Sequence, residues 1–492
     1  MQDRSWRQQR QEGSPVHRGH AVVVGGSIGD MLAARVLADH FEQVTVVERD
    51  QLPEGSENRP GVPQARHLHF LFKRGLMVAE ELFPGITADL QEAGSHLLDQ
   101  GSDFRILYRS GWSPRKEIGL EFCTFTRPLF EATVRRHLMT NPKVALRQGF
   151  EVAGLELDED KARVAGVRLR PRHRDPGVPV EEELLAAELV VDASGRSSKA
   201  ADWLEAVGYE KAEETVVDAF WGYATRIYEP VEEYKKEWKT LFIMNRPPFQ
   251  PRAGIIQPVE GNRWIVTIAG VMHDYPPTDE DGFLRFAKSL SSPELYRAIQ
   301  KARPLSRIWG YRRTENRLRS YEKARLPQGF AALGDSVCAF NPVYGLGMTL
   351  TGLEALELGR CLSEGRGALD TRRFQKRVAK LVAGPWALTT GEDLRWPTTE
   401  GGKLTAKVKF MHWYIEQVIR LIPQHQEVFH RFQEVNHMMK SPAALFHPSV
   451  LRRVLRQAFG PRPVYTRPKE AAVQVPATTA TATATSTVAI RR

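Results

Sequence analysis

The chain has 492 residues, which is too long for one hydrophobic core and predicts about two to four packing units. Its composition of 42% hydrophobic and 26% charged residues is typical of a folded protein and excludes wholesale disorder. The 69 Lys and Arg residues exceed the 59 Asp and Glu residues, for a formal charge of +10. Over this length the surplus is modest, so it indicates a solvated surface rather than a nucleic-acid-binding protein.

The cysteines and the N-terminus bear on the compartment. Cys123, Cys338 and Cys361 are widely spaced and form no CxxC pair, which argues against a disulfide framework and against a metal site. The N-terminus has no apolar signal-peptide core, and no apolar run approaches the roughly 18 residues that cross a bilayer. We therefore expect a cytoplasmic protein without a transmembrane segment.

The first predicted elements form a βαβ unit. A buried-strand pattern over 21–24 leads into a glycine turn, a helical pattern over 31–37 follows, and a second buried strand over 44–47 ends at Glu48. Strand, helix and strand within about 30 residues predict a parallel sheet. The residues before this unit, 1–19, are expected to form a flexible basic arm.

The next stretch alternates loops, helices and short strands. Residues 51–66 are predicted to form a long loop, and a helix is expected from Phe70 to Leu82. Another helix is expected to open at Arg127, because the proline that follows it suits a first turn. Four alternating segments between 143 and 191 predict a small antiparallel sheet.

The second half of the chain is predicted to be β-rich and then helical. Residues 216–270 hold two strand patterns around a hairpin turn, and 279–303 is expected to be helical. A buried strand over 330–333 precedes a second glycine turn and a helix. Residues 370–460 are predicted to form helices with many aromatic and basic side chains, and the Ala-Thr repeats beyond about 468 predict a disordered tail.

The first glycine turn has the chemistry of a pyrophosphate site. It comprises Gly25, Gly26, Ser27, Ile28 and Gly29, and it places backbone N–H groups at the start of a helix. Glu48, followed by Arg49, can accept hydrogen bonds from both hydroxyls of an adenosine ribose, which favours FAD or NAD over NADP. Ser27 and Asp30 stand where the common fingerprint has its second and third glycines. Taken alone, this turn also fits other α/β proteins.

The second turn makes a flavin site the favoured interpretation. Gly334-Asp335 follows the buried strand, and Asp335 can bond a ribityl or ribose hydroxyl. The backbone N–H groups of Gly345, Leu346, Gly347 and Met348 then begin a helix. Its positive end can face the N1–C2=O edge of a flavin, which carries the negative charge of the reduced ring. Two such turns about 300 residues apart, each between a strand and a helix, indicate FAD.

On these motifs the chain resembles the group A flavoprotein monooxygenases. They share the glutathione-reductase-type FAD fold with tryptophan halogenases and geranylgeranyl reductases. Further motifs of the resemblance are Arg127-Pro-Leu-Phe-Glu131 and Val191-Asp-Ala-Ser-Gly-Arg196, and it covers about residues 20–365. The segment 63–69 most resembles a bacterial subgroup that includes polyether epoxidases and related tailoring enzymes of secondary metabolism.

The resemblance implies roles for several residues. Glu48 would bind the adenosine ribose, Arg127 and Arg66 would lie near the cofactor, and Asp335 would contact the ribityl-pyrophosphate region. The motif Asp192–Arg196 would lie near the pyrophosphate. Ser27 and Asp30 leave the details of the pyrophosphate contacts open, but not the fold.

The expected fold class is α/β, with a Rossmann-like FAD-binding domain built on a parallel sheet, an interleaved β-rich substrate domain and a helical C-terminal region. The expected boundaries are 1–19 for the arm, 20–200 and 321–365 for the FAD-binding domain, 201–320 for the substrate domain, 366–465 for the helical region and 466–492 for the disordered tail.

The resemblance also implies the reaction. An FAD-dependent monooxygenase uses NADH or NADPH to reduce the flavin, and O2 then adds to form a flavin C4a-hydroperoxide. Its distal oxygen would epoxidise or hydroxylate a bulky hydrophobic secondary metabolite. Because the flavin itself performs this step, no catalytic side chain is assigned, and neither a nucleophile triad nor a metal is expected.

Three groups of side chains near the expected site have alternative interpretations. His67 and His69 are an acid–base pair, ligands, or residues that pack and hydrogen-bond beside the cofactor entrance. The aromatic residues of the β-rich region are either the floor of a substrate pocket or simple core; they are Phe220, Trp221, Tyr223, Phe242 and Trp264. The apolar and basic stripe over 407–422 packs on the main body, caps the pocket or lies on a membrane surface as a peripheral contact.

Other functions remain open from the sequence. An alkene or prenyl-chain reductase uses the same fold. A flavin halogenase needs a Trp-x-Trp-x-Ile-Pro segment, which is missing because Trp386 and Trp396 stand alone. A third alternative is a non-enzymatic FAD-binding protein whose helical region docks a partner.

Overall fold

The computed structural model describes residues 18–173, 181–231, 234 and 236–460. Residues 18 and 19 begin the first strand. The remainder of the predicted basic arm and the predicted tail over 466–492 lie outside the described residues.

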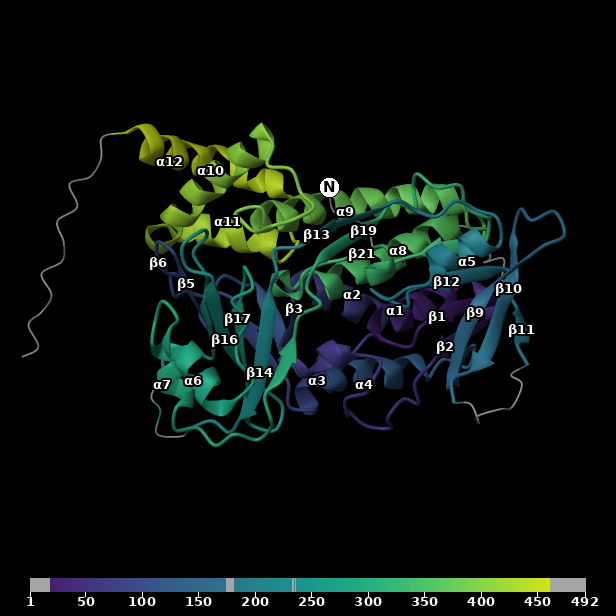
Figure 1. Ribbon diagram of the computed structural model, residues 1–492, viewed down its shortest axis with the longest axis horizontal. Helices are drawn as coiled ribbons and strands as arrows, with labels where there is room; N and C mark the ends of the chain where they lie inside the picture. The colour runs from purple at the N-terminus through teal and green to yellow at the C-terminus, as the bar shows by residue number, and fades with distance from the viewer. Residues whose placement is uncertain (1–17, 174–180, 232–233, 235, 461–492) are drawn as a thin grey trace, which may run out of the picture.

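A five-stranded parallel sheet lies in one half of the molecule, at the right of Figure 1. Its strands are β1 (Arg18–Val24), β2 (Phe41–Glu48), β8 (Val144–Gln148), β12 (Leu189–Asp192) and β20 (Phe330–Ala332), in the order β20-β12-β1-β2-β8. Helix α1 (Ile28–Leu37) connects β1 to β2, so the predicted βαβ unit is confirmed. The central strand β1 is almost wholly buried along Ala21–Val24, as expected for a strand covered on both faces.

The prediction of one antiparallel sheet over 143–191 is wrong for two of its four segments. β8 and β12 pair in parallel with β2 and β1 instead. The antiparallel sheet is made by β9 (Phe150–Leu157), β10 (Val164–Pro171) and β11 (Glu183–Ala186). The strand patterns were local, whereas the partners of β8 and β12 lie about 100 residues or more away in the chain, which alternation cannot reveal.

A seven-stranded sheet forms the other half of the molecule, at the lower left of Figure 1. In order across the sheet its strands are β18 (Trp309–Tyr311), β14 (Gly222–Tyr228), β17 (Arg263–Gly270), β16 (Arg252–Val259), β15 (Thr240–Ile243), β5 (Phe104–Tyr108) and β6 (Gly111–Trp112). The predicted hairpin is the β16–β17 pair. β5 and β6 come from inside the range expected for the FAD-binding domain. The chain therefore passes between the two halves more often than the predicted domain boundaries suggest.

Two small sheets join these halves. One contains β3 (His69–Leu71), β7 (Glu121–Phe125) and β4 (His96–Asp99), and the other contains β13 (Glu214–Val217), β19 (Asn316–Arg319) and β21 (Cys338–Ala339). The helix expected from Phe70 begins only at Lys73, as α2 (Lys73–Leu82), because β3 pairs with β7 first. Strand pairing overrides the local helical pattern at this point.

The helices cover the sheets in three groups. Along the parallel sheet lie α3 (Ile86–Glu92), α4 (Arg127–Leu138), α5 (Ala200–Ala206), α8 (Gly347–Glu364) and α9 (Thr371–Asp393). The predicted helical stretch 279–303 contains two helices, α6 (Glu280–Lys288) and α7 (Glu294–Ile299), which pack on the seven-stranded sheet. The C-terminal group is α10 (Ala406–Leu421), α11 (Gln426–Asn436) and α12 (Pro448–Phe459), at the upper left of Figure 1.

The C-terminal helices share a hydrophobic core with the main body. Tyr414, Val418 and Phe429 pack with Phe104 and Phe122 of β5 and β7. The buried face of α10 therefore packs on the main body, which was one of the three alternatives for its apolar stripe.

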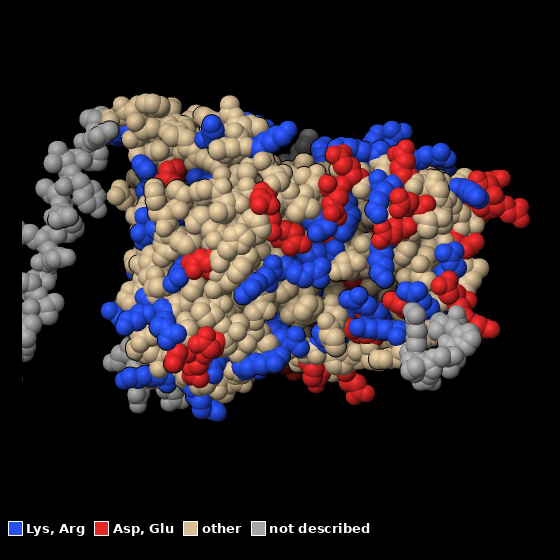
Figure 2. All heavy atoms as spheres, viewed as in Figure 1, with Lys and Arg blue, Asp and Glu red and all other residues tan. Residues whose placement is uncertain are grey.

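The surface carries mixed charge. On the face shown in Figure 2, Lys and Arg alternate with Asp and Glu rather than forming one continuous basic field. In the part of the chain that the structure describes, no helix combines the length and the hydropathy needed to cross a bilayer.

Candidate cofactor and substrate site

A single cavity of about 970 Å³ extends between the parallel sheet, the seven-stranded sheet and the C-terminal helices. Most of the residues predicted for the site line it, namely Gly25, Gly26, Ser27, Ile28, Gly29, Glu48, Arg49, Arg127, Asp335, Gly345, Leu346, Gly347, Met348, Trp221, Tyr223 and Phe242. The residues Arg66, Phe220 and Trp264 do not line it. Both glycine turns, which are far apart in sequence, thus meet in one cavity.

The first glycine turn is held by three hydrogen bonds that its backbone N–H groups donate. The N–H of Gly25 donates to the Val47 carbonyl at 2.8 Å, and the N–H of Gly26 donates to Glu48 Oε2 at 2.7 Å. The N–H of Ser27 donates to Asp30 Oδ2 at 2.8 Å. These three donors bind the protein itself. The helix-start N–H groups that can face a phosphate are therefore those of the next residues, beginning at Ile28.

Asp30, at the place of the third fingerprint glycine, points beneath the turn. It is 2% exposed, and a Cβ on Gly25 would lie 2.2 Å from its Oδ1. Burial raises the pKa of Asp30 well above its ordinary value, and the nearby Glu48 carboxylate raises it further. Asp30 therefore binds a proton more tightly than an exposed aspartate does, which reduces the repulsion that it would exert on a pyrophosphate.

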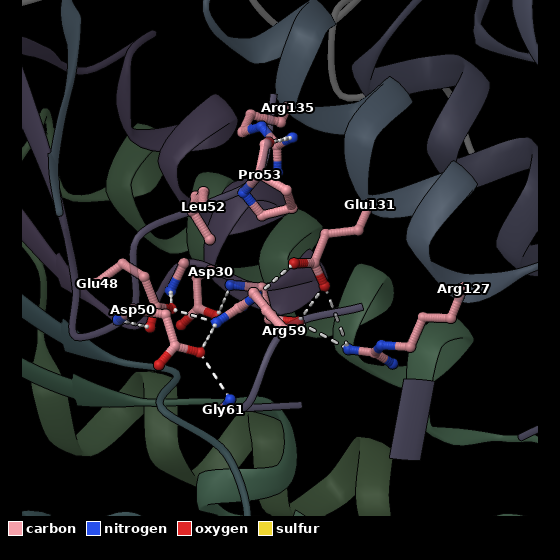
Figure 3. A network of polar contacts seen from close by, with 12 residues as sticks. Asp30, Glu48, Asp50, Leu52, Pro53, Arg59, Gly61, Arg127, Glu131 and Arg135 are labelled. Atoms are coloured by element: carbon pink, nitrogen blue, oxygen red, sulfur yellow. Dashed lines mark hydrogen bonds and ion pairs between the residues drawn. The ribbon is translucent and has the colours of Figure 1, made fainter. Parts of the chain in front are cut away.

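Glu48 belongs to a buried ionic cluster, drawn in Figure 3. Its Oε1 accepts from the N–H of Asp50 at 2.8 Å, and its Oε2 lies 3.1 Å from Arg59 Nη1. Arg59 also lies 3.0 Å from Asp50 Oδ2 and 2.8 Å from Glu131 Oε1. Arg59 Nη1 and Nε thus tie the 51–66 loop, strand β2 and helix α4 together beside the first glycine turn.

Arg127 extends this cluster toward the cavity. Its Nη2 donates to Ser27 Oγ at 2.7 Å, and Ser27 Oγ donates to Glu131 Oε2 at 2.9 Å. The Nε of Arg127 is buried without a hydrogen-bond partner among the described residues. Because the side chain lines the cavity, this orphaned donor is available to an anionic ligand there.

The second turn presents an acid and a helix start. Asp335 lies in a 3-10 turn after β20, and a Cβ on Gly347 would lie 3.7 Å from its Oδ1. Burial raises the pKa of Asp335, while Arg196 and Arg127 act in the opposite direction. Gly345 has φ +67°, a left-handed conformation that glycine adopts without strain, and α8 begins two residues later. No hydrogen-bond donor from the described part of the chain reaches the Asp335 carboxylate, so it is open to a hydroxyl.

The motif Asp192–Arg196 has a divided role. Ala193 to Arg196 line the cavity, whereas Asp192 is fully buried behind them. Its Oδ1 accepts from Ser194 Oγ at 2.6 Å, and its Oδ2 accepts from Ser198 Oγ at 2.6 Å. Asp192 therefore shapes the turn, and the residues after it face the cavity.

The two histidines of segment 63–69 are neutral packing residues. Burial lowers the pKa of His67 to about 4 and that of His69 to about 3. The ring of His67 hydrogen-bonds Thr225 Oγ1 at 2.8 Å and packs against Tyr311. This geometry favours the packing interpretation over an acid–base pair. Arg66 is half-buried beside His67 rather than at the cavity wall.

A buried carboxylate joins the end of helix α9 to the segment before the second glycine turn. Asp393, the last residue of α9, accepts from Tyr344 Oη at 2.7 Å, Trp221 Nε1 at 3.1 Å and Asn316 Nδ2 at 2.5 Å. The same Asn316 side chain accepts from the N–H of Asn341 at 2.9 Å. Residues 341–344 directly precede the glycine turn, so these hydrogen bonds hold the segment that leads into the turn.

The far end of the cavity is an apolar chamber. Its walls come from the seven-stranded sheet and from the C-terminal helices, with Phe242, Met244, Ile255, Ile415, Ile419, Phe432, Val435, Met438 and Leu445. Of the five predicted aromatic residues, Trp221, Tyr223 and Phe242 face the cavity. Trp264 is 2% exposed within the core beside Trp238, and Phe220 stacks on His273 with a centroid distance of 4.0 Å.

Sequence reasoning missed several residues of the site. Arg59 stands alone in a polar loop, and Asp393 lies at the end of a helix far from either glycine turn. Glu131 was quoted within a motif but given no role. The chamber residues of α10, α11 and the 438–445 segment carry only a helical pattern, which does not distinguish a chamber wall from core.

These residues fit an FAD molecule. The cavity joins the acid cluster around Glu48, a helix start and the orphaned donor of Arg127 to a second helix start beside Asp335. A dinucleotide flavin needs this sequence of partners, in which donors face the phosphates and acceptors face the hydroxyls. Asp30, at the third-glycine position that departs from the common fingerprint, is a buried acid whose pKa is raised by burial.

Comparison with known proteins agrees with this geometry. The chain is 32% identical over 388 residues to Protein Rv3254 of Mycobacterium tuberculosis, covering 77% of this chain and 80% of that protein. A search of family models found no match.

Solved structures share the fold at low sequence identity. A triple mutant of the flavin-dependent brominase Bmp2 has a TM-score of 0.61 and 13% identity, covering 89% of this chain and 99% of that one. The p-nitrophenol 4-monooxygenase PnpA of Pseudomonas putida has a TM-score of 0.55 and 15% identity, with coverage of 87% and 100%. PqsL of Pseudomonas aeruginosa, a probable FAD-dependent monooxygenase, has a TM-score of 0.54 and 16% identity, with coverage of 83% and 99%. With the glycine turns and the cavity between them in place, the chain has the group A flavoprotein monooxygenase fold, and it belongs to the family of Protein Rv3254.

Proposed function

We propose that the protein is an FAD-dependent monooxygenase that uses NADH or NADPH and O2 to hydroxylate or epoxidise a bulky, apolar small molecule. The observation that carries the proposal is the continuity of the cavity. A single space of about 970 Å³ leads from the two glycine turns into the apolar chamber. A cofactor held at the turns therefore shares one enclosure with any ligand in the chamber.

The residues divide into three tasks. Glu48 would hold the ribose, Arg127 and the start of α1 the pyrophosphate, and Asp335 the ribityl chain. The N–H groups at the start of α8 would stabilise negative charge on the flavin ring. The bound FAD supplies the redox and oxygen chemistry, so the chain needs no nucleophile of its own.

The chamber determines which substrates bind. Its walls are apolar side chains such as Met438 and Leu445, with a few polar groups such as Gln433 and Asn436 among them. Such a lining favours a large hydrophobic ligand with one or two polar groups. It also excludes water from the reaction, which protects reactive intermediates from hydrolysis.

We assign the parts of the chain accordingly. Among the described residues, those within 20–200 and 321–365 would hold FAD, while those within 201–320 and 366–460 would form the chamber. We place the protein in the cytoplasm, in keeping with its three cysteines, all of them free and buried.

The proposal is tested with purified protein reconstituted with FAD. We expect a yellow protein whose NADH or NADPH oxidation accelerates when a polyene, terpene or polyketide substrate is added. The acceleration should require O2, and the product should gain one oxygen atom by mass spectrometry. Turnover under anaerobic conditions with a product that gains two hydrogens would instead identify an alkene reductase.

Two further arms cover the remaining alternatives. Adding bromide or chloride should leave the product unhalogenated, and a halogenated product would overturn the proposal in favour of a halogenase. Flavin that is bound but never bleached by NADH or NADPH, with every substrate tried, would indicate a non-enzymatic FAD-binding protein.

A further inference from the structure

Helix α10 has apolar side chains on two faces, and only one of them is covered. Ile415 and Ile419 line the cavity, and Val418 lies in the core beneath the helix. On the other side, Phe410 is 52% exposed and Trp413 is 36% exposed, with their ring centroids 5.8 Å apart. Large aromatic side chains that gather on a surface are unusual in a protein that faces only water.

Helix α12 continues this exposed surface. Arg452, Leu455, Arg456 and Phe459 recur at the spacing of one helix face, and all four are exposed. Phe459 is 76% exposed, and its ring centroid lies 6.2 Å from that of Trp413. The two helices therefore present one patch rather than two separate ones.

The patch is strongly basic at its rim. It comprises Phe410, Trp413, Leu455 and Phe459 with the exposed cations Lys407, Lys409, Arg452 and Arg456, and we call it the α10–α12 patch. The segments 402–415 and 448–460 contain no Asp or Glu. Within the described chain, none of these four cations forms an ion pair, whereas many other basic side chains of the protein do. In Figure 2 the surface over α10 and α12 is mostly uncharged, with scattered Lys and Arg.

We propose that the α10–α12 patch docks the protein on an anionic lipid surface. Phe and Trp side chains insert at the boundary between headgroups and acyl chains, and Lys and Arg pair with anionic headgroups. Each basic side chain near such a surface strengthens its attraction to anionic headgroups, so four unpaired cations give a strong preference for anionic over zwitterionic lipid. The charge complementarity selects lipid rather than a second copy, because a second copy of this patch carries the same positive charge.

The position of the patch relates docking to the chamber. Leu445 lines the cavity, and its neighbour Phe446 is 37% exposed and stacks on Tyr414 with a centroid distance of 4.3 Å. The patch and the apolar chamber thus lie on opposite sides of helix α10. An apolar substrate dissolved in the membrane would reach the chamber from this side. That last step rests on the proposed function, whereas docking itself does not.

Docking is measured by sedimentation of the full-length protein with vesicles. The protein should sediment with vesicles that contain phosphatidylglycerol and stay in solution with vesicles of phosphatidylcholine alone, and added salt should weaken binding. The Leu455→Ser, Phe459→Ser double variant should lose about tenfold in vesicle affinity or more, and so should Arg452→Glu, Arg456→Glu. Matched controls outside the patch are Phe249→Ser, whose side chain is 90% exposed, and the exposed cations in Arg285→Glu, Lys301→Glu.

Specific outcomes would overturn the proposal. Equal sedimentation of the wild-type protein and both patch variants, or binding that ignores lipid charge, would do so. A dimer in light scattering that the patch variants dissociate, without any vesicle binding, would identify the patch as an interface between copies. FAD content and NADPH oxidation of each variant are measured alongside. If the wild-type protein binds the vesicles but shows no flavin-dependent NADPH oxidation, the result would count against the proposed function and not against docking of the α10–α12 patch.

Discussion

Arg59 Nε donates to Glu131 Oε1 at 2.8 Å, and this contact holds the 51–66 loop against helix α4. The side chains of both residues are less than a tenth exposed. Arg59 also faces Glu48 and Asp50, so one guanidinium compensates three buried carboxylates beside the first glycine turn. Burial lowers the pKa of Arg59, but the carboxylates together raise it above its ordinary value, so the cluster has a permanent cation at its centre.

Removing the Arg59 guanidinium should lower the free energy of unfolding. In Arg59→Met, three buried carboxylates lose their common partner, and leaving buried charge unpaired typically costs about 3–5 kcal/mol. We expect a loss of that order in the free energy of unfolding, measured by urea denaturation, together with weaker FAD binding. Arg115→Met is the matched control, because its partner Glu237 is largely exposed and the pair should contribute little. Equal stability of the two variants would show that the cluster is not held by Arg59.

Glu48 should affect both the cofactor and the turn. In Glu48→Gln the size is kept, but the new amide can no longer accept from Gly26 N–H and Asp50 N–H with both of its polar atoms. We expect FAD affinity to fall about tenfold, since one lost charge-assisted hydrogen bond is worth about 1.5 kcal/mol or more. The affinity for FMN, which lacks the adenosine, should change less in fluorescence titrations. Equal losses for FAD and FMN would contradict the ribose role.

Removing the Asp335 carboxylate should not lower the stability of the protein, in contrast to removing the Arg59 guanidinium. Its carboxylate is partly buried, and it has no hydrogen-bond donor from the described protein, so removing it relieves a desolvated charge. Asp335→Ala should therefore keep the stability of the flavin-free protein or raise it, while FAD content after purification falls strongly. Thermal unfolding of the flavin-free protein and the absorbance of bound flavin measure the two effects. Full FAD retention would show that Asp335 does not contact the cofactor.

The parts of the fold that could be predicted from the sequence were those built from neighbouring residues. The βαβ unit, the hairpin β16–β17 and the start of α4 at Arg127 each depend on a short stretch of chain. The placement of β12 between β1 and β20 could not be predicted in this way, because its partners are far apart in sequence.

The same division applies to the site. The glycine turns could be predicted from the sequence, because the spacing of their residues reflects backbone geometry. Both turns line the cavity. Phe220 and Trp264 show why aromatic residues at strand spacing were less informative: the alternation marks two faces without telling which one meets a cavity. Asp393 has no sequence signal, since its partners Trp221, Asn316 and Tyr344 come from three other segments that only the tertiary fold brings together.

Asp393 makes a prediction about pH. Burial is the largest influence and raises the pKa of Asp393 to about 7, although Tyr344, Trp221 and Asn316 donate to it; the neighbouring Glu392 raises the pKa further. Between about pH 4 and pH 7 the folded protein therefore holds a proton at this carboxyl that the unfolded chain has released. The folded state binds more protons in that window, so its free energy of unfolding falls as the pH rises, by about 1.4 kcal/mol for each pH unit.

We expect Asp393→Asn to remove that slope, because an amide does not titrate. Urea denaturation of the flavin-free wild-type protein at pH 5 and pH 7 should show the decline, and the variant should show a smaller one. Asp202→Asn is the control, since Asp202 is exposed and its loss should leave the wild-type slope intact. A wild-type slope that survives in Asp393→Asn would place the titrating group elsewhere. The variant should also loosen residues 341–344, because its amide would offer Tyr344, Trp221 and Asn316 one oxygen where the carboxyl group of Asp393 offers two.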